Sequence, residues 1–260
     1  MKTARPWRLS SFVLGLWLPL AVLALWQALA ARHLLNALFF PAPTTLAATG
    51  WALMKSGELG SQVVATLTRM FAGCAIGVVT GLACGLLMGA VGPIRRTLEP
   101  AISALNSTPK LALLPMLMLF TGVGETARIV PIALTSFVIL AMHGLDAVRG
   151  VNQAYVELAR NHGAGRRALL RRVYLPASLP QVFTGLRLSL GRSVVITISV
   201  ELVGAENGLG NMIWMAWQTF STEKLYIGVF STAVLGVLFH NGLRSLETRL
   251  IPWADRGGAA

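Results

Sequence analysis

The sequence predicts an all-α integral membrane protein with about six transmembrane helices. Its 260 residues are 55% hydrophobic and only 12% charged, whereas a soluble domain is typically about 25% charged. Several apolar runs approach twenty residues, which is long enough for a helix to cross the roughly 30 Å hydrocarbon core of a bilayer. The mean hydropathy of +0.66 agrees with this fold class. These three observations argue against a soluble protein.

The first predicted span is the apolar run from Phe12 to Ala30, which follows a short basic start. A cleaved signal peptide is the alternative, but the run is longer than a usual signal core, and no clean small-x-small cleavage site follows it. We therefore interpret it as a retained helix. The other spans are predicted at 63–88, 101–121 (after Pro100), 127–145, 180–204 and 226–243, with a short interfacial helix at 45–57. Pro109 and Pro115 interrupt the third span.

The distribution of Lys and Arg predicts that both termini lie in the cytoplasm. With this topology, fourteen of the 22 basic residues fall in cytoplasmic segments and only four in external segments. Positive residues concentrate on the cytoplasmic side of membrane proteins, and the opposite orientation would reverse this bias. The net charge of +12 therefore reflects membrane orientation, and we expect contact with membrane lipids and no nucleic-acid partner.

A basic segment, ELARNHGAGRRALLRRVYLP, lies between the fourth and fifth predicted spans at residues 157–176. Residues in and just before it recur at three or four positions, as on one face of a helix: Val151, Tyr155, Leu158 and His162. Gly163 then fits the C-cap of that helix. A second short helix is predicted from Arg166 to Tyr174, with Pro176 ending it. We expect a compact helix–turn–helix on the cytoplasmic face.

This segment resembles the EAA loop in permease subunits of binding-protein-dependent ABC importers, of the sulfonate, nitrate and taurine subfamily. The matching positions follow the family's spacing, with nine residues between the glycine and the final group: Glu157, Ala159, Gly163, Val173, Leu175 and Pro176. Leu158 replaces the usual central alanine. The similarity continues through LPASLPQVFTGLRLSLGRS and TPKLALLPMLMLFTGVGET, and it extends from about residue 40 to 253.

The resemblance implies a type I ABC importer permease fold in which this loop is the coupling helix that docks on a cytoplasmic ATPase. It implies that the following residues contact the ATPase: Glu157, Leu158, Ala159, Gly163, Ala164, Leu175 and Pro176. A different interpretation applies to four arginines of the loop, which could anchor to anionic lipid headgroups: Arg166, Arg167, Arg171 and Arg172. No G-x-x-x-x-G-K-[ST] phosphate loop occurs in the sequence. We therefore expect no cofactor on this chain, and ATP and Mg²⁺ on a separate subunit.

The implied organisation has three parts. Residues 1–57 form an N-terminal tail, the first transmembrane helix and the external interfacial segment. Residues 58–250 form the transport domain, with the coupling loop at about 147–178, and residues 251–260 form a cytoplasmic tail. The implied assembly is a homodimer with two ATPase subunits and a periplasmic or lipid-anchored binding protein, in the bacterial inner membrane. It would import a small anionic solute such as a sulfonate, nitrate or taurine.

Five glycines in the second predicted span are spaced four residues apart: Gly73, Gly77, Gly81, Gly85 and Gly89. Small residues on one face of a membrane helix allow a neighbouring helix to approach closely. The series therefore predicts a helix-packing face. A sliding surface used during gating would give the same pattern, and the sequence does not distinguish the two.

A second stripe with this spacing lies in the fifth predicted span and is polar: Gly185, Ser189, Ser193, Thr197 and Glu201. A polar face on a membrane helix lines either a partner helix or a water-filled cavity, and a carboxylate there needs a partner. We expect Ser189, Ser193, Thr197 and Glu201, together with Lys110, to line the translocation pathway. The alternative for Glu201 is a structural salt bridge to Arg128 or Lys110.

The sequence shows no pattern typical of a metal centre or an enzyme active site. Its four histidines are scattered without metal-ligand spacing, and Cys74 and Cys84 lie within one apolar run. We therefore expect a transporter subunit without metal ligands. An ion-coupled secondary transporter is the rival class, because it would also use membrane-embedded charges. It would not explain the coupling-loop pattern.

Overall fold

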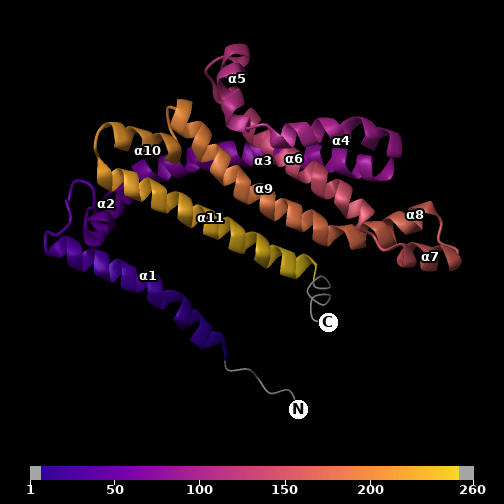
Figure 1. Cartoon of the computed structure of the whole chain (residues 1–260), viewed down its shortest axis with the longest axis horizontal. Helices are drawn as coiled ribbons and strands as arrows, with labels where there is room; N and C mark the ends of the chain where they lie inside the picture. The colour runs from indigo at the N-terminus through magenta and orange to yellow at the C-terminus, as the bar shows by residue number, and fades with distance from the viewer. Residues whose placement is uncertain (1–6, 252–260) are drawn as a thin grey trace. The chain divides into compact units, whose positions relative to one another are not determined.

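The computed structural model describes residues 7–251, with side chains from residue 17 onward except that of Arg166. Figure 1 shows helices throughout this part of the chain, and no strand occurs within it. In order, the α-helices are α1 (Trp7–Ala31), α2 (Pro43–Lys55), α3 (Glu58–Ala90), α4 (Gly92–Ser107), α5 (Leu114–Thr121), α6 (Glu125–Arg149), α7 (Gln153–Asn161), α8 (Arg166–Leu169), α9 (Leu175–Gly204), α10 (Leu209–Gln218) and α11 (Thr222–Leu250). A 3₁₀ turn, Lys110–Leu113, precedes α5, and a π-helical turn, Leu170–Tyr174, precedes α9.

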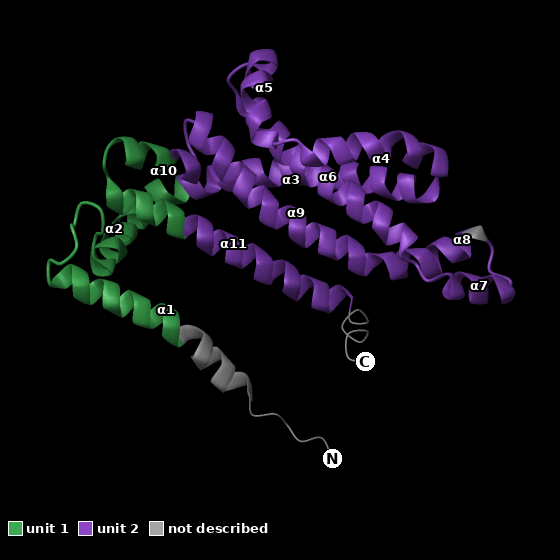
Figure 2. Ribbon diagram, viewed as in Figure 1, with its two compact units in different colours: residues 1–61, 212–230 green, residues 62–211, 231–260 purple. Residues whose placement is uncertain are grey.

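The chain forms two compact units (Figure 2). The smaller unit comprises residues up to 61 together with 212–230, and the larger comprises 62–211 together with the residues from 231 onward. The predicted boundary between residues 57 and 58 stays a prediction. The predicted cytoplasmic tail, 251–260, lies outside the described residues except for Ile251.

In the smaller unit, the beginning of α11 holds the N-terminal helices together. The ring of Tyr226 lies 5.5 Å from that of Trp26 on α1, and its hydroxyl donates to the carbonyl of Phe39 at 3.2 Å. The ammonium of Lys224 pairs with Glu58 at 2.6 Å. Helix α2 covers most of the segment for which a short interfacial helix is predicted.

Three described helices are long and apolar enough to cross a bilayer: α3, α6 and α11. They contain the whole of the predicted second, fourth and sixth spans. Two bent helix pairs raise the number to five if each pair forms one span, and the part of α1 with described side chains is apolar but shorter. The expected total of six spans therefore stays a prediction.

The third predicted span is not one straight helix. Helix α4 and the segment Lys110–Thr121 meet at an angle of 92°. Thr108 and Pro109 are extended at the bend, as expected for a proline and the residue before it. Pro100 lies inside α4, so the prediction that the span starts after it is wrong. Pro115 lies in the first turn of α5, where its missing N–H breaks no helical hydrogen bond.

The prediction that Pro176 ends the second loop helix is also wrong. Helix α8, the π-helical turn and α9 follow without a break, so the fifth span begins well before Pro180. The N–H of Leu175 donates to the carbonyl of Leu170, five residues back, which is the π-helical pattern. The extra residue in this turn places Pro176 in the first turn of α9, where a proline is tolerated.

The glycine series of α3 lies directly against α6. A Cβ atom added to Gly77, Gly81 or Gly85 would lie 2.2–2.3 Å from the carbonyl oxygen of Ala133, Phe137 or Ala141, respectively. Atoms cannot approach so closely, and a backbone carbonyl cannot swing away as a flexible side chain does. The two helix backbones are therefore in contact along this face, and the glycines are what permits it.

We predict that Gly81→Ala destabilises the protein by about 1–3 kcal/mol, because one methyl group must force α3 away from α6. Gly60→Ala, in the same helix, is the matched control, since nothing lies within 4 Å of a Cβ there. The melting temperature of both variants is measured by heating each sample and monitoring the remaining folded protein by fluorescence-detected size exclusion. Equal melting temperatures for the two would show that the glycine face is not a packing surface.

Candidate functional site

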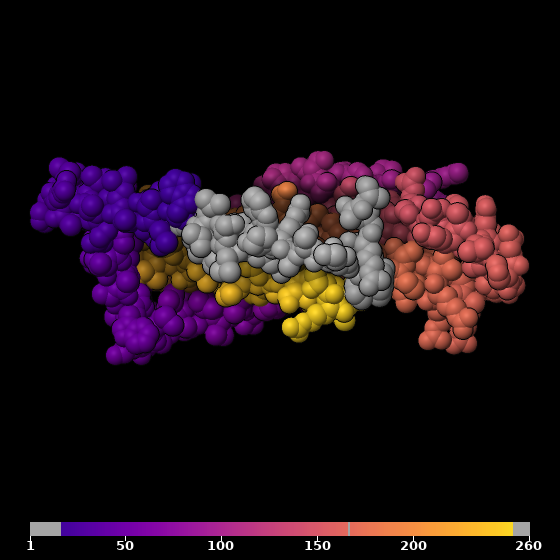
Figure 3. Space-filling view, turned by 90° about the horizontal axis from the view of Figure 1, so that it is seen from below, coloured from indigo at the N-terminus to yellow at the C-terminus, as the bar shows by residue number. Residues whose placement is uncertain are grey.

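The basic segment forms a folded projection at one end of the larger unit. Helices α7 and α8 lie between the end of α6 and the beginning of α9, and the space-filling view shows the segment standing out at that end (Figures 1 and 3). Asn152 caps α7, its side-chain oxygen accepting from the N–H of Ala154 at 2.9 Å. Gly163 has a φ of 76°, a left-handed conformation that favours glycine, and it allows the turn between α7 and α8.

The projection has its own small core. Val151, Val156 and Leu169 are buried in it. Partly buried apolar side chains pack against them: Ala159, Ala164, Val173 and Tyr174. Ala159 and Ala164, predicted to form a small face for the ATPase, thus also support the fold of the loop itself.

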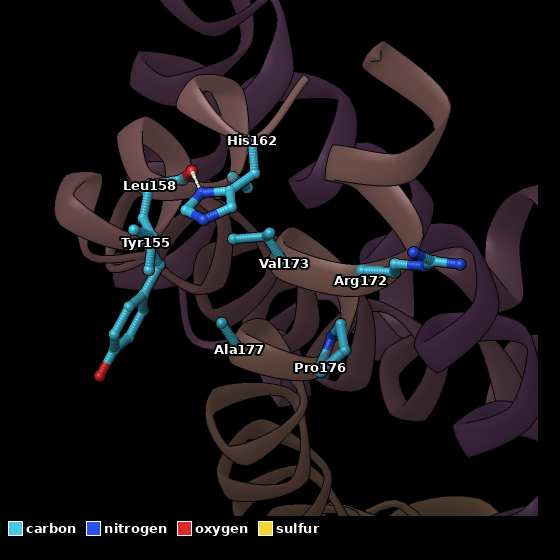
Figure 4. A pocket seen from close by; sticks show the side chains of 8 residues that line it. Tyr155, Leu158, His162, Arg172, Val173, Pro176 and Ala177 are labelled. Carbon is cyan, nitrogen blue, oxygen red and sulfur yellow. Dashed lines mark hydrogen bonds between the residues drawn. The ribbon is translucent and has the colours of Figure 1, made fainter. Parts of the chain in front are cut away.

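A groove of about 550 Å³ crosses the outer face of this projection (Figure 4). It is lined by Tyr155, Leu158, Ala159, His162, Arg172, Val173, Pro176 and Ala177. Figure 4 shows Tyr155 and Arg172 on opposite sides of it, with the imidazole Nδ1 of His162 bonded to the carbonyl of Leu158 at 2.8 Å. The groove brings together three of the predicted contact residues: Leu158, Ala159 and Pro176.

The surroundings of the groove are unusually apolar for an exposed loop. Tyr155 is 60% exposed, Leu158 58% and Leu175 55%. The predicted contact residue Glu157 is also exposed, and among the described residues it forms no salt bridge. Exposed apolar residues rimmed by charges mark an interaction surface. The three- and four-residue spacing had placed Tyr155 and His162 on one helix face. The positions of Val173 and Ala177 in the groove became clear only from the structure, because they follow the turn at Gly163.

At the other end of α9, a buried arginine joins three helices. Arg69 of α3 binds Glu125 at the start of α6 with two hydrogen bonds, at 2.6 and 2.8 Å. It also binds Glu201 of α9 at 2.8 Å and the carbonyl of Asn207 at 2.7 Å. Arg128 adds a bond to Glu125 and two to the carbonyl of Gly204. This cluster fixes the ends of α3, α6 and α9 relative to each other.

The carboxylate of Glu201 is fully enclosed by donors. Besides Arg69, it accepts from the hydroxyl of Thr66 and the N–H of Gly210, both at 2.9 Å. The expectation of a partner for this charge is correct, but the predicted partners, Arg128 and Lys110, are wrong. Arg69 lies 132 residues away in the sequence, and only the packing of α3 on α9 identifies it.

The rest of the polar stripe is buried between helices rather than lining open space. Ser189, Ser193 and Thr197 have no exposed surface, and Glu201 is 1% exposed. Ser193 bonds to Ser136 of α6 at 2.9 Å, and Thr197 donates to its own helix. These four residues contact neighbouring helices in this structure, and the expectation that they line a pathway stays a prediction. Hydroxyls that bond between neighbouring helices produce the same sequence pattern as a pathway.

Lys110 differs from the other predicted pathway residues because it lies at a cavity. The cavity measures about 650 Å³ and is bounded by the 3₁₀ turn, α6 and α9 of the larger unit. The predicted pathway residues therefore fall into two groups: four are buried between helices, whereas Lys110 lines a cavity. Among the described residues, no group of three or more His, Cys, Asp or Glu side chains could hold a metal ion.

Fold and surface together define an all-α membrane protein with several apolar helices and an exposed, folded basic projection. Residues 77–252 match the family of binding-protein-dependent transport system inner membrane components, and the chain belongs to this family. It is therefore the permease subunit of an ABC importer in the bacterial inner membrane, a transport component and not an enzyme. Such a permease works with an ATPase and a binding protein. The secondary-transporter alternative is not favoured.

Two relatives extend the comparison over most of the chain. The taurine transport system permease protein TauC of Escherichia coli is 33% identical, over 89% of this chain and 86% of its own. The putative aliphatic sulfonates transport permease protein SsuC of Bacillus subtilis is 33% identical, over 93% of this chain and 87% of its own length. A solved structure of the MetNI methionine ABC transporter matches with a TM-score of 0.65 and 22% identity, over 74% of this chain and 95% of its own. That likeness shows the type I permease fold.

We predict that Glu201→Gln lowers stability by about 1–3 kcal/mol, because the amide NH₂ must face one of the three donors around this site and leaves it unsatisfied. The control is Glu206→Gln, at an exposed carboxylate without a salt bridge among the described residues. Melting temperature in detergent and uptake per folded molecule are measured on the same preparation. An unchanged melting temperature would contradict the role of Glu201 in holding α3 to α9.

Proposed function

We propose that this permease imports a small organic sulfonate, such as taurine or an aliphatic sulfonate, with energy from ATP hydrolysed on a separate subunit. Support for the substrate comes from the two relatives named for taurine and aliphatic sulfonates, which are similar over most of the chain. The observation that carries the coupling to ATP is the exposed groove between α7 and α9. It lies in the segment with the coupling-loop spacing.

In this proposal the ATPase docks on the groove. Tyr155 and Leu158 supply exposed apolar surface that gains stability when a partner covers it. Glu157 beside them forms no salt bridge within the described chain, so it is free to pair with a basic or amide group of the ATPase. Gly163 shapes the turn, and Leu175 and Pro176 continue the surface onto α9. ATP and Mg²⁺ bind the ATPase and not this chain.

The proposed assembly contains two copies of this permease and two ATPase subunits, because each chain supplies one docking segment. A periplasmic or lipid-anchored binding protein delivers the solute to the external face. Membrane lipids cover the exposed apolar residues of the helices, such as Leu20 and Leu25 of α1 and Val237 and Leu238 of α11. The exposed cations of the loop, among them Arg171, can also reach anionic headgroups beside the ATPase.

Reconstitution tests this function directly. Proteoliposomes containing the permease and its ATPase should accumulate labelled taurine or an aliphatic sulfonate only with the binding protein and MgATP. Vanadate, which traps ABC ATPases, should stop uptake. Uptake that follows a proton or sodium gradient without ATP would overturn the proposal in favour of a secondary transporter.

We predict that Leu158→Ser reduces ATPase co-purification by about fivefold or more, because a central apolar anchor at an interface contributes more than about 1 kcal/mol. Leu170→Ser is the matched control, since Leu170 is 62% exposed on the same projection and does not line the groove. Glu157→Lys should likewise weaken docking, because it places a positive charge next to the groove where the wild type has a negative one. Co-purification that is equally strong for the two leucine variants would exclude the groove as the docking surface.

A further inference from the structure

The cavity beside Lys110 combines two positive charges with apolar walls. Lys110 reaches it from the 3₁₀ turn and Arg192 from the middle of α9. The two are close enough for their charges to repel each other. The walls carry aliphatic side chains from three elements: Leu111, Ile139, Met142, Leu188, Val195 and Ile196. A volume of about 650 Å³ falls within the range of small-molecule sites.

Neither cation is neutralised by a carboxylate of the part of the protein that the structure describes. Among the described residues, no carboxylate lies within salt-bridge distance of Lys110 or Arg192. Lys110 uses one donor, to the carbonyl of Asn106 at 2.7 Å, which leaves two. The guanidinium of Arg192 has five N–H donors and forms no hydrogen bond within the described part of the chain. A cation in a membrane helix is costly unless it meets water or a counter-charge, so this pair is suited to receive an anion.

The other polar groups of the cavity do not compete for that role. The hydroxyls of Thr108, Thr135 and Ser199 each donate to a carbonyl of their own helix. Asp146 is the acidic residue of the lining, and no described cation pairs with it. Ser193, next to Arg192, bonds to Ser136 of α6, and Asp146 lies ten residues further along α6, about 15 Å at 1.5 Å per residue. Arg192 and Asp146 are therefore attached at different levels of the two helices that line the cavity.

We propose that this cavity is a solute-binding site within the permease, selective for a monovalent organic anion with an aliphatic chain. The anionic head lies between Lys110 and Arg192, where the planar guanidinium can bind two oxygens at once. The carbon chain packs on the aliphatic walls. This inference rests on the proposed import of organic sulfonates and adds where such a solute binds inside the membrane.

The combination of charge and apolar wall defines the ligand class. An inorganic anion would satisfy the two cations but leave the walls in contact with water. A longer aliphatic chain removes more apolar surface from water, and each buried methylene improves affinity by up to about fourfold. Sulfonates with chains of three to six carbons should therefore bind progressively more tightly, while an inorganic anion such as nitrate should bind weakly.

The experiment is calorimetric titration of the nucleotide-free permease–ATPase complex in nanodiscs of zwitterionic lipid, with empty nanodiscs subtracted. The ligands are 1-propanesulfonate, 1-hexanesulfonate and nitrate, with 1-hexylammonium as the cation of equal chain length. We expect hexanesulfonate to bind best and hexylammonium not to bind. Arg192→Gln and Lys110→Gln should each weaken hexanesulfonate binding by about 10- to 100-fold, and Arg192→Lys should retain more affinity than Arg192→Gln.

Matched variants separate a site from a general charge effect. Lys55→Gln and Arg96→Gln remove cations that do not line the cavity, and both should leave binding unchanged. Asp146→Asn should leave binding unchanged or strengthen it. Equal losses in the cavity and control variants, binding of hexylammonium, or affinity independent of chain length would each overturn the site.

Failure of this inference differs from failure of the proposed function. If wild-type complex imports sulfonates with MgATP but the cavity variants bind and transport normally, the function stands and the site is wrong. If the wild type neither assembles with an ATPase nor imports sulfonates, the function itself is wrong. Folding of each variant is checked by size exclusion and by ATPase co-purification. A variant that has lost only anion binding should behave like the wild type in both measurements.

Discussion

The architecture of the larger unit depends on one ion pair cluster, in which the buried Arg69 joins the buried Glu201 and the exposed Glu125. These residues come from α3, α6 and α9, so a single guanidinium fixes the ends of three helices. Removing one partner of a buried pair leaves an uncompensated charge, which typically costs about 3–5 kcal/mol. Gly210 and Thr66 complete the shell of Glu201 and tie the turn between α9 and α10 to the same point. The helices therefore have one defined relative position at this end.

Away from this cluster, close contact between helix backbones holds the helices of the larger unit together. The glycines of α3 allow its backbone to touch α6 along several turns, and on α9, Ser193 and Gly185 pack against Ser136 and His143 of α6. Helix α6 thus contacts both α3 and α9 through small residues. Such an interface gains its stability from van der Waals contact and a few interhelical hydrogen bonds, which is how membrane helices associate without a hydrophobic driving force between them.

The sequence predicts local patterns of this molecule better than its long-range partners. The glycine series and the folded loop follow from spacing within one segment, and the structure places both where the pattern indicates. The end of a helix at Pro176 was wrong because a single extra residue in the turn Leu170–Tyr174 moves that proline to a tolerated position. The partner of Glu201 could not be read from the sequence, which offered Arg128 and Lys110 as candidates, whereas the observed partner is Arg69. A stripe of hydroxyls has the same spacing whether it faces a solute or another helix.

The continuous helix from the loop to Gly204 links the two ends of the larger unit. From Arg167 it spans 38 residues, about 57 Å at 1.5 Å per residue, and it carries Pro176 of the groove, Arg192 of the cavity and Glu201 of the ion pair cluster. In the proposed assembly, a force applied at the groove would act along this one hydrogen-bonded helix. It would pass the cavity and reach the ion pair between Glu201 and Arg69. The π-helical turn Leu170–Tyr174 lies at the groove itself, since Arg172 and Val173 of this turn line it, and such turns are frequent at functional sites. In the proposed assembly the Arg69 cluster holds the far end, so a displacement of the docking end would change the position of Arg192 relative to Lys110, which belongs to a different element.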